Sequence, residues 1–76
     1  MKKKKQTIGD RMRVCREELG FSQRELSRKA GVSRMLVNRL ENEEDIPDLD
    51  EVILIAAALG VEPDFLAFGK RGLVPA

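Results

Sequence analysis

Apolar positions recur every three or four residues along most of this chain, and the pattern predicts a series of short helices. The first is expected over residues 8–19, capped by Thr7 with Asp10 in its first turn. Gly20 ends it, because glycine readily adopts the left-handed conformation that closes many helices. The predicted buried face of this helix consists of Ile8, Met12, Cys15 and Leu19.

Two shorter helices are predicted next, joined by a turn that contains Gly31. Ser22 and Glu25 have the spacing of a capping box at the start of one helix, and Ser33 caps the other, which runs to about Asn42. The buried positions of the first of these helices are Leu26 and Ala30. Two short helices with a glycine-containing turn of three or four residues are typical of a helix-turn-helix motif.

The helix after Gly31 has two chemically different sides when its residues are placed at 100° intervals. One side faces the predicted core and carries Ser33, Val37, Leu40 and Glu41. The other side is polar and carries Arg34, Met35, Asn38, Arg39 and Asn42. An apolar stripe opposite an arginine-containing face is what a helix needs to pack on its own domain while it lies in a DNA groove.

Two further helices complete an all-α fold. Asp48 and Glu51 are expected to cap the fourth helix, and Gly60 ends it. Its predicted core face is Leu49, Val52, Ile53, Ala56 and Leu59. Pro63 suits the first position of a fifth helix that ends at Phe68. The globular domain is therefore predicted over residues 8–68, between a disordered basic arm at 1–7 and a flexible tail at 69–76.

Composition removes several classes of function. The chain has no histidine, tyrosine or tryptophan and one cysteine, Cys15, which excludes His-assisted nucleophiles, His-containing zinc sites and an internal disulfide. We therefore expect neither an enzyme nor a bound cofactor or metal. The longest apolar run, residues 52–59, is too short to span a bilayer, and no signal peptide precedes it. These features predict a cytoplasmic protein without a membrane partner.

The net charge of +1 conceals a strong asymmetry between the two halves of the chain. Residues 1–39 carry a formal charge of +8, and residues 40–76 carry −7. The basic half contains the predicted helix-turn-helix motif, so the charge favours a polyanionic partner on that side.

The motifs of residues 21–61 resemble those of the phage-repressor and Cro-like helix-turn-helix family. They occur in the family's order as Ser-Gln-x-Glu-Leu, Ala-Gly-Val-Ser, Leu-Glu-Asn and Ala-Leu-Gly-Val. The resemblance covers about residues 8–68 and implies a five-helix, lambda-repressor-like DNA-binding domain whose second and third helices contact double-stranded DNA. Small members of this family include phage repressors, restriction-modification controllers and antitoxins, and the sequence does not choose among them.

The resemblance also implies roles for individual residues. Gln23 would hold a phosphate and brace the base-reading side chains, while Arg34 and Met35 would enter the major groove first. Arginine can contact guanine, asparagine adenine, and an apolar thioether the thymine methyl group. The alternative is solvated surface charge for the arginines and a contact with a protein partner for Met35. The full set of expected DNA-binding residues is Gln23, Ser33, Arg34, Met35, Asn38 and Arg39.

Two departures from the family pattern follow the third helix. Where the family usually has glycine and then a basic residue, this chain has an acidic loop at residues 43–45. We expect Asn42 to supply the left-handed turn. The loop either weakens DNA binding or points away from the duplex, and residues 2–5, four lysines, either add phosphate contacts or serve only as a solubilising tail.

One pair of residues and one set of four apolar residues are expected to have structural roles. The resemblance implies an ion pair between Arg16 and Glu41. The predicted fourth helix is apolar almost all round, which predicts either a homodimer interface or deeper burial within the monomer. The expected interface residues are Leu54, Ala57, Phe65 and Phe68.

The function predicted from the sequence is therefore a sequence-specific, double-stranded DNA-binding transcriptional regulator, a homodimer on a palindromic operator. The rival hypothesis is a protein-interaction module on the same fold, such as an antitoxin or a polymerase-binding adaptor. The acidic loop favours the rival, whereas Gln23, Arg34 and Arg39 favour DNA binding.

Overall fold

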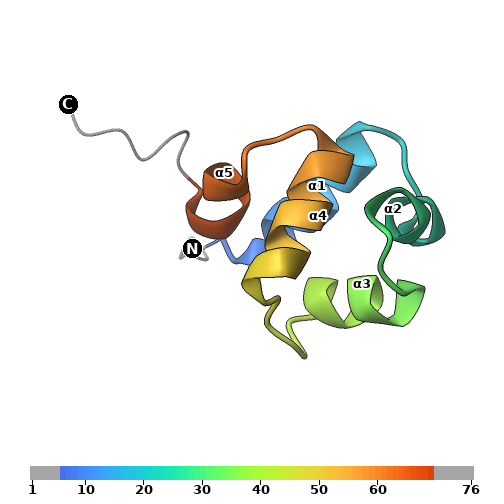
Figure 1. Cartoon of the computed structure of the whole chain (residues 1–76), viewed down its shortest axis with the longest axis horizontal. Coiled ribbons are helices and arrows are strands. Elements are labelled where there is room, and N and C mark those ends of the chain that lie inside the picture. Colours follow the sequence, from blue (N-terminus) through green and yellow to red (C-terminus); the bar gives the residue numbers. More distant parts are fainter. Residues whose placement is uncertain (1–5, 70–76) are drawn as a thin grey trace, which may run out of the picture.

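A computed structural model describes residues 6–69, which form five α-helices and no strand, so the predicted all-α class is confirmed. Helices α1 and α4 lie at the centre, with α2 and α3 on one side and α5 on the other (Figure 1). The residues on the predicted polar side of α3 are exposed, and α3 lies on the opposite side of the domain from α5 (Figure 1). The helix bounds are α1 Ile8–Glu18, α2 Gln23–Ala30, α3 Arg34–Glu41, α4 Leu49–Leu59 and α5 Pro63–Phe68.

Capping boxes fix where three of the helices begin. The side chains of Thr7, Ser22 and Asp48 accept hydrogen bonds from the backbone N–H three residues on, at 3.1, 3.0 and 2.8 Å. In each case the carboxylate of the residue at that third position accepts a hydrogen bond from the backbone N–H of the capping residue. These pairs satisfy backbone donors that have no partner within the helix, and all three are at the predicted positions.

Each helix contributes a fully buried side chain to a single core. These residues, each with an exposed fraction of 0%, are Met12, Leu26, Val37, Ile55 and Leu66. Truncation of such a side chain to alanine typically costs about 2–5 kcal/mol. The core therefore fixes α3 against the rest of the domain through Val37, on the side opposite its polar residues.

Three positions predicted to be buried are exposed instead. Leu19 is 49% exposed because it is the C-cap of α1, where the chain already leaves the helix. Leu49 and Ile53 are 72% and 45% exposed, and Ile55 is in the core in their place. Residues 52–59 are apolar on every side, so their periodicity does not determine which side of α4 packs inward.

Gly9 allows α1 to approach the end of α3 closely. A Cβ atom at this position would overlap the carbonyl oxygen of Leu40 and lie 3.3 Å from the Cα of Glu41. Backbone atoms cannot move aside as a flexible side chain can. Glycine at this position therefore sets the distance between α1 and the C-terminal end of α3.

Arg11 is buried and holds the C-terminal end of α5, a role that the sequence reading missed. Its guanidinium donates to the carbonyl oxygens of Leu66 at 2.8 Å, Ala67 at 3.0 Å and Gln6 at 3.0 Å. Cations are favourable beside the carbonyl groups at a helix C-terminus. The available signal was its position, since Arg11 lies three residues after Ile8 and thus on the same side of α1.

The left-handed residue after α3 is Glu43, with φ of +62°, so the prediction that placed this conformation at Asn42 is wrong. Asn42 has φ of −88° and ends the helix as its C-cap. A left-handed conformation costs an L-residue other than glycine, asparagine or aspartate roughly 1–2 kcal/mol. The Glu43 carboxylate accepts a hydrogen bond from the Thr7 hydroxyl at 3.0 Å, which ties the loop to the start of α1.

Glu43→Gly is expected to have a free energy of unfolding about 1 kcal/mol above that of Glu43→Ala, because both variants lose the bond to Thr7 but only glycine adopts positive φ without a steric cost. For a domain of this size that is a difference in Tm of roughly 4–8 °C, measurable by thermal denaturation. Glu43→Ala is the matched control, since it removes the same side chain but keeps the Cβ atom. Equal stability of the two variants would contradict the proposed backbone strain.

Candidate nucleic-acid interface

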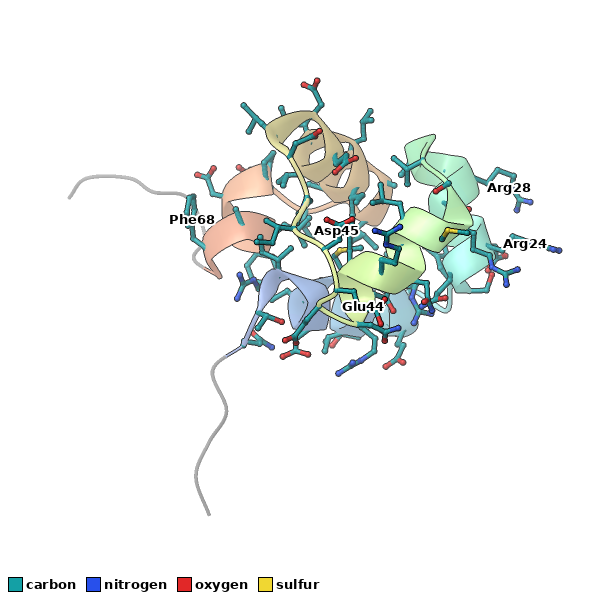
Figure 2. All side chains as sticks on the ribbon, turned by 90° about the horizontal axis from the view of Figure 1, so that it is seen from below. Arg24, Arg28, Glu44, Asp45 and Phe68 are labelled. Atoms are coloured by element: carbon teal, nitrogen blue, oxygen red, sulfur yellow. The ribbon has the colours of Figure 1, made fainter. Side chains whose placement is uncertain are left out.

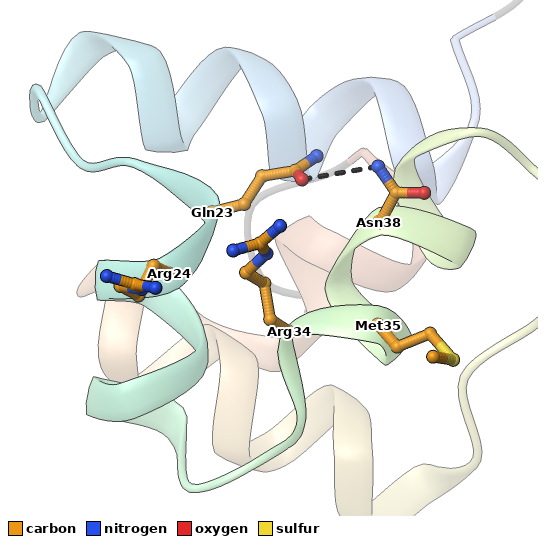
Figure 3. A pocket seen from close by; sticks show the side chains of 5 residues that line it. All are labelled: Gln23, Arg24, Arg34, Met35 and Asn38. Carbon is orange, nitrogen blue, oxygen red and sulfur yellow. Dashed lines mark hydrogen bonds between the residues drawn. The ribbon is translucent and has the colours of Figure 1, made fainter.

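Helices α2 and α3 together form an open surface hollow of about 580 Å³. All five residues that line it come from these two helices: Gln23, Arg24, Arg34, Met35 and Asn38 (Figure 3). Four of them, all except Arg24, are among the predicted DNA-binding residues. The hollow combines cationic, amide and apolar groups, the chemistry that base edges and phosphates require.

Ser33, Arg34 and Met35, at the start of α3, are exposed to solvent. Ser33 is the N-cap, and its hydroxyl accepts from the Leu36 backbone N–H at 3.0 Å. Arg34 is exposed and makes no ion pair within residues 6–69, and its guanidinium points toward Gln23 across the hollow (Figure 3). Met35 is 67% exposed and points away from Gln23. A cation and a thioether are thus available to an incoming ligand.

Arg16 and Glu41 form a bidentate ion pair between α1 and the end of α3. The Nε and Nη2 atoms of Arg16 donate to the two carboxylate oxygens of Glu41 at 2.8 and 3.0 Å, and Nη1 donates to the Phe21 carbonyl at 2.9 Å. The Glu41 side chain is 3% exposed and that of Arg16 12%. Hydrogen bonding to Glu41 raises the pKa of Arg16 above its ordinary value, against the opposing effect of partial burial.

A row of side-chain amides continues from this ion pair to the surface. Gln23 donates through Nε2 to the Glu41 carboxylate at 3.1 Å, and its Oε1 accepts from Nδ2 of Asn38 at 3.2 Å (Figure 3). The Oδ1 atom of Asn38 in turn accepts from Nδ2 of Asn42 at 3.2 Å. The resemblance implied that Gln23 braces the base-reading side chains, but not that the row begins at Glu41 and continues to Asn42.

Arg39 is the one predicted DNA-binding arginine that has an acidic neighbour in the described part of the chain. Its Nη2 atom lies 3.4 Å from a carboxylate oxygen of Asp45, and both side chains are nearly half exposed. Exposed ion pairs of this kind contribute only about 0–1 kcal/mol, so a phosphate can displace the carboxylate. The acidic loop thus bends back toward the end of α3 and partly compensates Arg39.

Arg24, which lines the hollow, and Arg28, which does not, add positive charge to α2, and neither was singled out from the sequence. They are one turn apart on α2, both are exposed, and both project from the same edge of the molecule (Figure 2). Phe68 lies at the opposite edge in this view. Their spacing of four residues on the polar side of α2 was the available signal.

The apolar surface of α4 and α5 is partly open to solvent. Leu54 is 45% exposed and Phe68 62%, while Ala57 is exposed and Phe65 is half-buried. The alternative of deep burial within the monomer is therefore wrong for Leu54 and Ala57. Ile53, at 45% exposed, extends this surface.

Residues 6–69 contain no helix that is long and apolar enough to cross a membrane. Within the same residues, no group of three or more cysteine, aspartate or glutamate side chains is placed to hold a metal ion. Burial, and after it the Glu18 carboxylate, raises the pKa of the Cys15 thiol, which disfavours the nucleophilic thiolate. Of the predicted arm at residues 1–7 and the predicted tail at 69–76, residues 1–5 and 70–76 lie outside the described residues.

Five helices in this order, with a glycine-containing turn between α2 and α3 and an open polar face on α3, define the class of helix-turn-helix DNA-binding domains. The family model for helix-turn-helix proteins matches residues 12–66, and the chain belongs to that family. The predicted membership and the lambda-repressor-like fold are thus confirmed. Fold and family are those of DNA-binding transcription regulators.

Two curated relatives are phage-derived regulators. Repressor protein C2 of Salmonella phage P22 is 31% identical over 64 residues, which are 84% of this chain and 30% of that protein. The SPbeta prophage-derived HTH-type transcriptional regulator YonR of Bacillus subtilis is 33% identical over 64 residues, 84% of this chain and 59% of that protein. This chain therefore spans about a third and three fifths, respectively, of the relatives' lengths.

The structural comparison agrees. The crystal structure of the P22 c2 repressor in complex with a synthetic operator superposes with a TM-score of 0.82 and 30% identity, covering 87% of this chain and all of that one. At this identity and coverage, the likeness extends over the whole five-helix domain.

Proposed function

We propose that this protein is a sequence-specific, double-stranded DNA-binding transcriptional regulator that inserts the polar face of α3 into the major groove. In this proposal Arg34 and Met35 contact base edges first, Asn38 and Arg39 follow one turn later, and Gln23 holds a phosphate. The Ser33 hydroxyl, at the N-terminal end of α3, can add a contact to the DNA backbone. Each specific base contact supplies about 1–3 kcal/mol of discrimination.

The observation that carries this proposal is the open, cationic surface formed by α2 and α3. Arg34 has no acidic partner within residues 6–69, and its guanidinium is accessible beside the exposed Arg24. A structural arginine would be compensated by a carboxylate or by backbone carbonyls, as Arg16 and Arg11 are here. The likeness to a repressor in complex with a synthetic operator supports DNA binding by this chain.

The proposal includes a homodimer formed by the outer sides of α4 and α5, which contain Leu54, Ala57, Phe65 and Phe68. We favour a second copy of this chain as the partner of this surface, because a copy bound there would leave the α2–α3 surface free to contact DNA (Figure 2). Two copies related by a two-fold axis would place their α3 helices in successive major grooves, about 34 Å apart. The expected target is then a palindromic operator.

Leu54→Glu is expected to weaken such a dimer about 100-fold or more, because an unpaired charge buried in an apolar interface costs several kcal/mol. The fold should be retained, since Leu54 is 45% exposed in the monomer. Sedimentation equilibrium measures the change. Val14→Glu, at a residue 39% exposed on α1, is the matched control and should leave the dimer intact. A parent protein that remains monomeric at high micromolar concentration would contradict the dimer.

Selection of bound sites from a random pool of duplex DNA tests the whole proposal. The expected result is enrichment of a sequence with two inverted half-sites, whose centres are about 10–10.5 base pairs or a multiple of that apart. Enrichment of a single half-site would retain DNA recognition but reject the dimer. Failure to enrich any sequence would reject sequence-specific binding.

A further inference from the structure

The hydrogen-bonded row from Glu41 to Asn42 can be assembled in one direction only. An ionised carboxylate is an acceptor and has no hydrogen to donate. Both carboxylate oxygens of Glu41 accept from the Arg16 guanidinium, at 2.8 and 3.0 Å. The group of Gln23 that faces Glu41 at 3.1 Å must therefore be its NH₂, which turns the carbonyl of Gln23 toward α3.

The same donor–acceptor argument applies to the amides of Asn38 and Asn42 on the surface of α3. Because Gln23 offers a carbonyl, Asn38 must present its NH₂ to it, at 3.2 Å. The carbonyl of Asn38 then points along the helix and accepts from the NH₂ of Asn42, also at 3.2 Å. Rotation of the Asn38 amide by 180° would place two carbonyls against each other on one side and two NH₂ groups on the other.

We propose that Glu41 and Asn42 are positioning residues that fix the orientation of the Asn38 amide and thereby the base that it reads. Glu41 acts from the buried end of the row through Gln23, and Asn42 acts from the exposed end. This inference rests on the proposed function, in which Asn38 contacts a base edge. Neither residue needs to touch DNA for this role.

The orientation matters because a base edge presents donors and acceptors in a fixed order. In the major groove, adenine presents the N7 acceptor beside the N6 donor, so a bidentate contact needs an amide with NH₂ and carbonyl in the matching order. An amide held in one orientation matches one order of donor and acceptor on the base edge, whereas an amide that rotates freely can match either order. Fixing Asn38 therefore narrows the bases accepted at one position of each half-site.

Asn42→Asp tests the proposal by replacing the terminal donor with an acceptor. A hydrogen bond to an ionised carboxylate is roughly twice as strong as one between neutral groups, so the Asn38 NH₂ should turn toward Asp at this position and away from Gln23. We expect the base preference at one half-site position to fall or change on the order of tenfold, measured by competition among single-base operator variants. The fold should persist, because Asn42 is exposed.

Two controls isolate the orientation effect from contact and charge. Asn42→Ala removes one of the two bonds that orient the Asn38 amide and leaves the bond to Gln23, so its base preference should lie between those of the parent and of Asn42→Asp. Asn42→Asp combined with Glu44→Gln restores the net charge of the parent and should retain the altered preference. If Asn42→Asp lowered the affinity for all sequences equally, or if its preference matched that of Asn42→Ala, the proposal would be wrong.

An NMR measurement on the DNA-free protein decides the orientation independently of DNA binding. In the parent, the Asn38 side-chain NH₂ protons should show NOEs to the Gln23 side chain, and in Asn42→Asp these should be lost. NOEs that persist unchanged in Asn42→Asp would overturn the inference. Absence of DNA binding by the parent would instead reject the proposed function, and the two failures are thus distinguishable.

Discussion

Replacement of Arg16 by alanine is expected to lower the free energy of unfolding by about 3–5 kcal/mol, because it leaves the Glu41 carboxylate buried without its partner. Glu41 is 4% exposed, and among the described residues only Gln23 would still donate to it through a side chain. Folded domains are stable by about 5–15 kcal/mol, so the loss is a large fraction of the total. Chemical denaturation of parent and variant measures it.

Arg13→Ala on the same helix is the matched control. The Arg13 guanidinium lies 3.5 Å from Asp10 and its side chain is 45% exposed, so its loss should change stability by less than about 1 kcal/mol. DNA affinity measured on the folded fraction of Arg16→Ala should change less than its stability does. Equal unfolding midpoints for Arg16→Ala and the parent would contradict a structural role for the ion pair.

Replacement of Arg34 by alanine is expected to weaken binding to the preferred operator by about 1–3 kcal/mol, or roughly 5- to 150-fold, while relaxing the preference at one base position. Stability should not change, since the exposed guanidinium makes no ion pair within residues 6–69. Fluorescence anisotropy with the operator and its single-base variants measures both the affinity for the operator and the base preference.

Arg28→Ala is the appropriate comparison for Arg34→Ala. Arg28 is exposed on α2 beside the proposed interface, where a phosphate contact is expected rather than a base contact (Figure 2). Its loss should weaken binding to all sequences about equally. The same uniform loss for Arg34→Ala would reassign Arg34 from the bases to the phosphates.

The sequence predicted those parts of the fold that depend on local chemistry. The capping residues Thr7, Ser22 and Asp48 set helix starts through bonds that span three residues, and such bonds follow from spacing alone. The exposed side of α3 followed from periodicity, because polar and apolar residues alternate there at helical spacing. The orientation of α4 could not be predicted from periodicity, because residues 52–59 are apolar on every side of the helix.

The parts that could not be predicted depend on contacts between distant segments. Arg11 is a core residue only because the carbonyl groups at the end of α5 lie against α1. The row of amides exists only because α2 and α3 cross at Gln23 and Asn38, which are 15 residues apart. The pairing of Arg39 with Asp45 required the path of the acidic loop, which its composition did not define.

The central claim is that the exposed surface of α2 and α3 binds duplex DNA, and a salt titration with random-sequence duplex tests it most directly. The account predicts measurable affinity at low salt and a linear fall of log K against log salt, with a slope of about −0.9 for each phosphate neutralised and a total of roughly −3 or steeper. A flat response, or no binding at 50 mM salt, would contradict it.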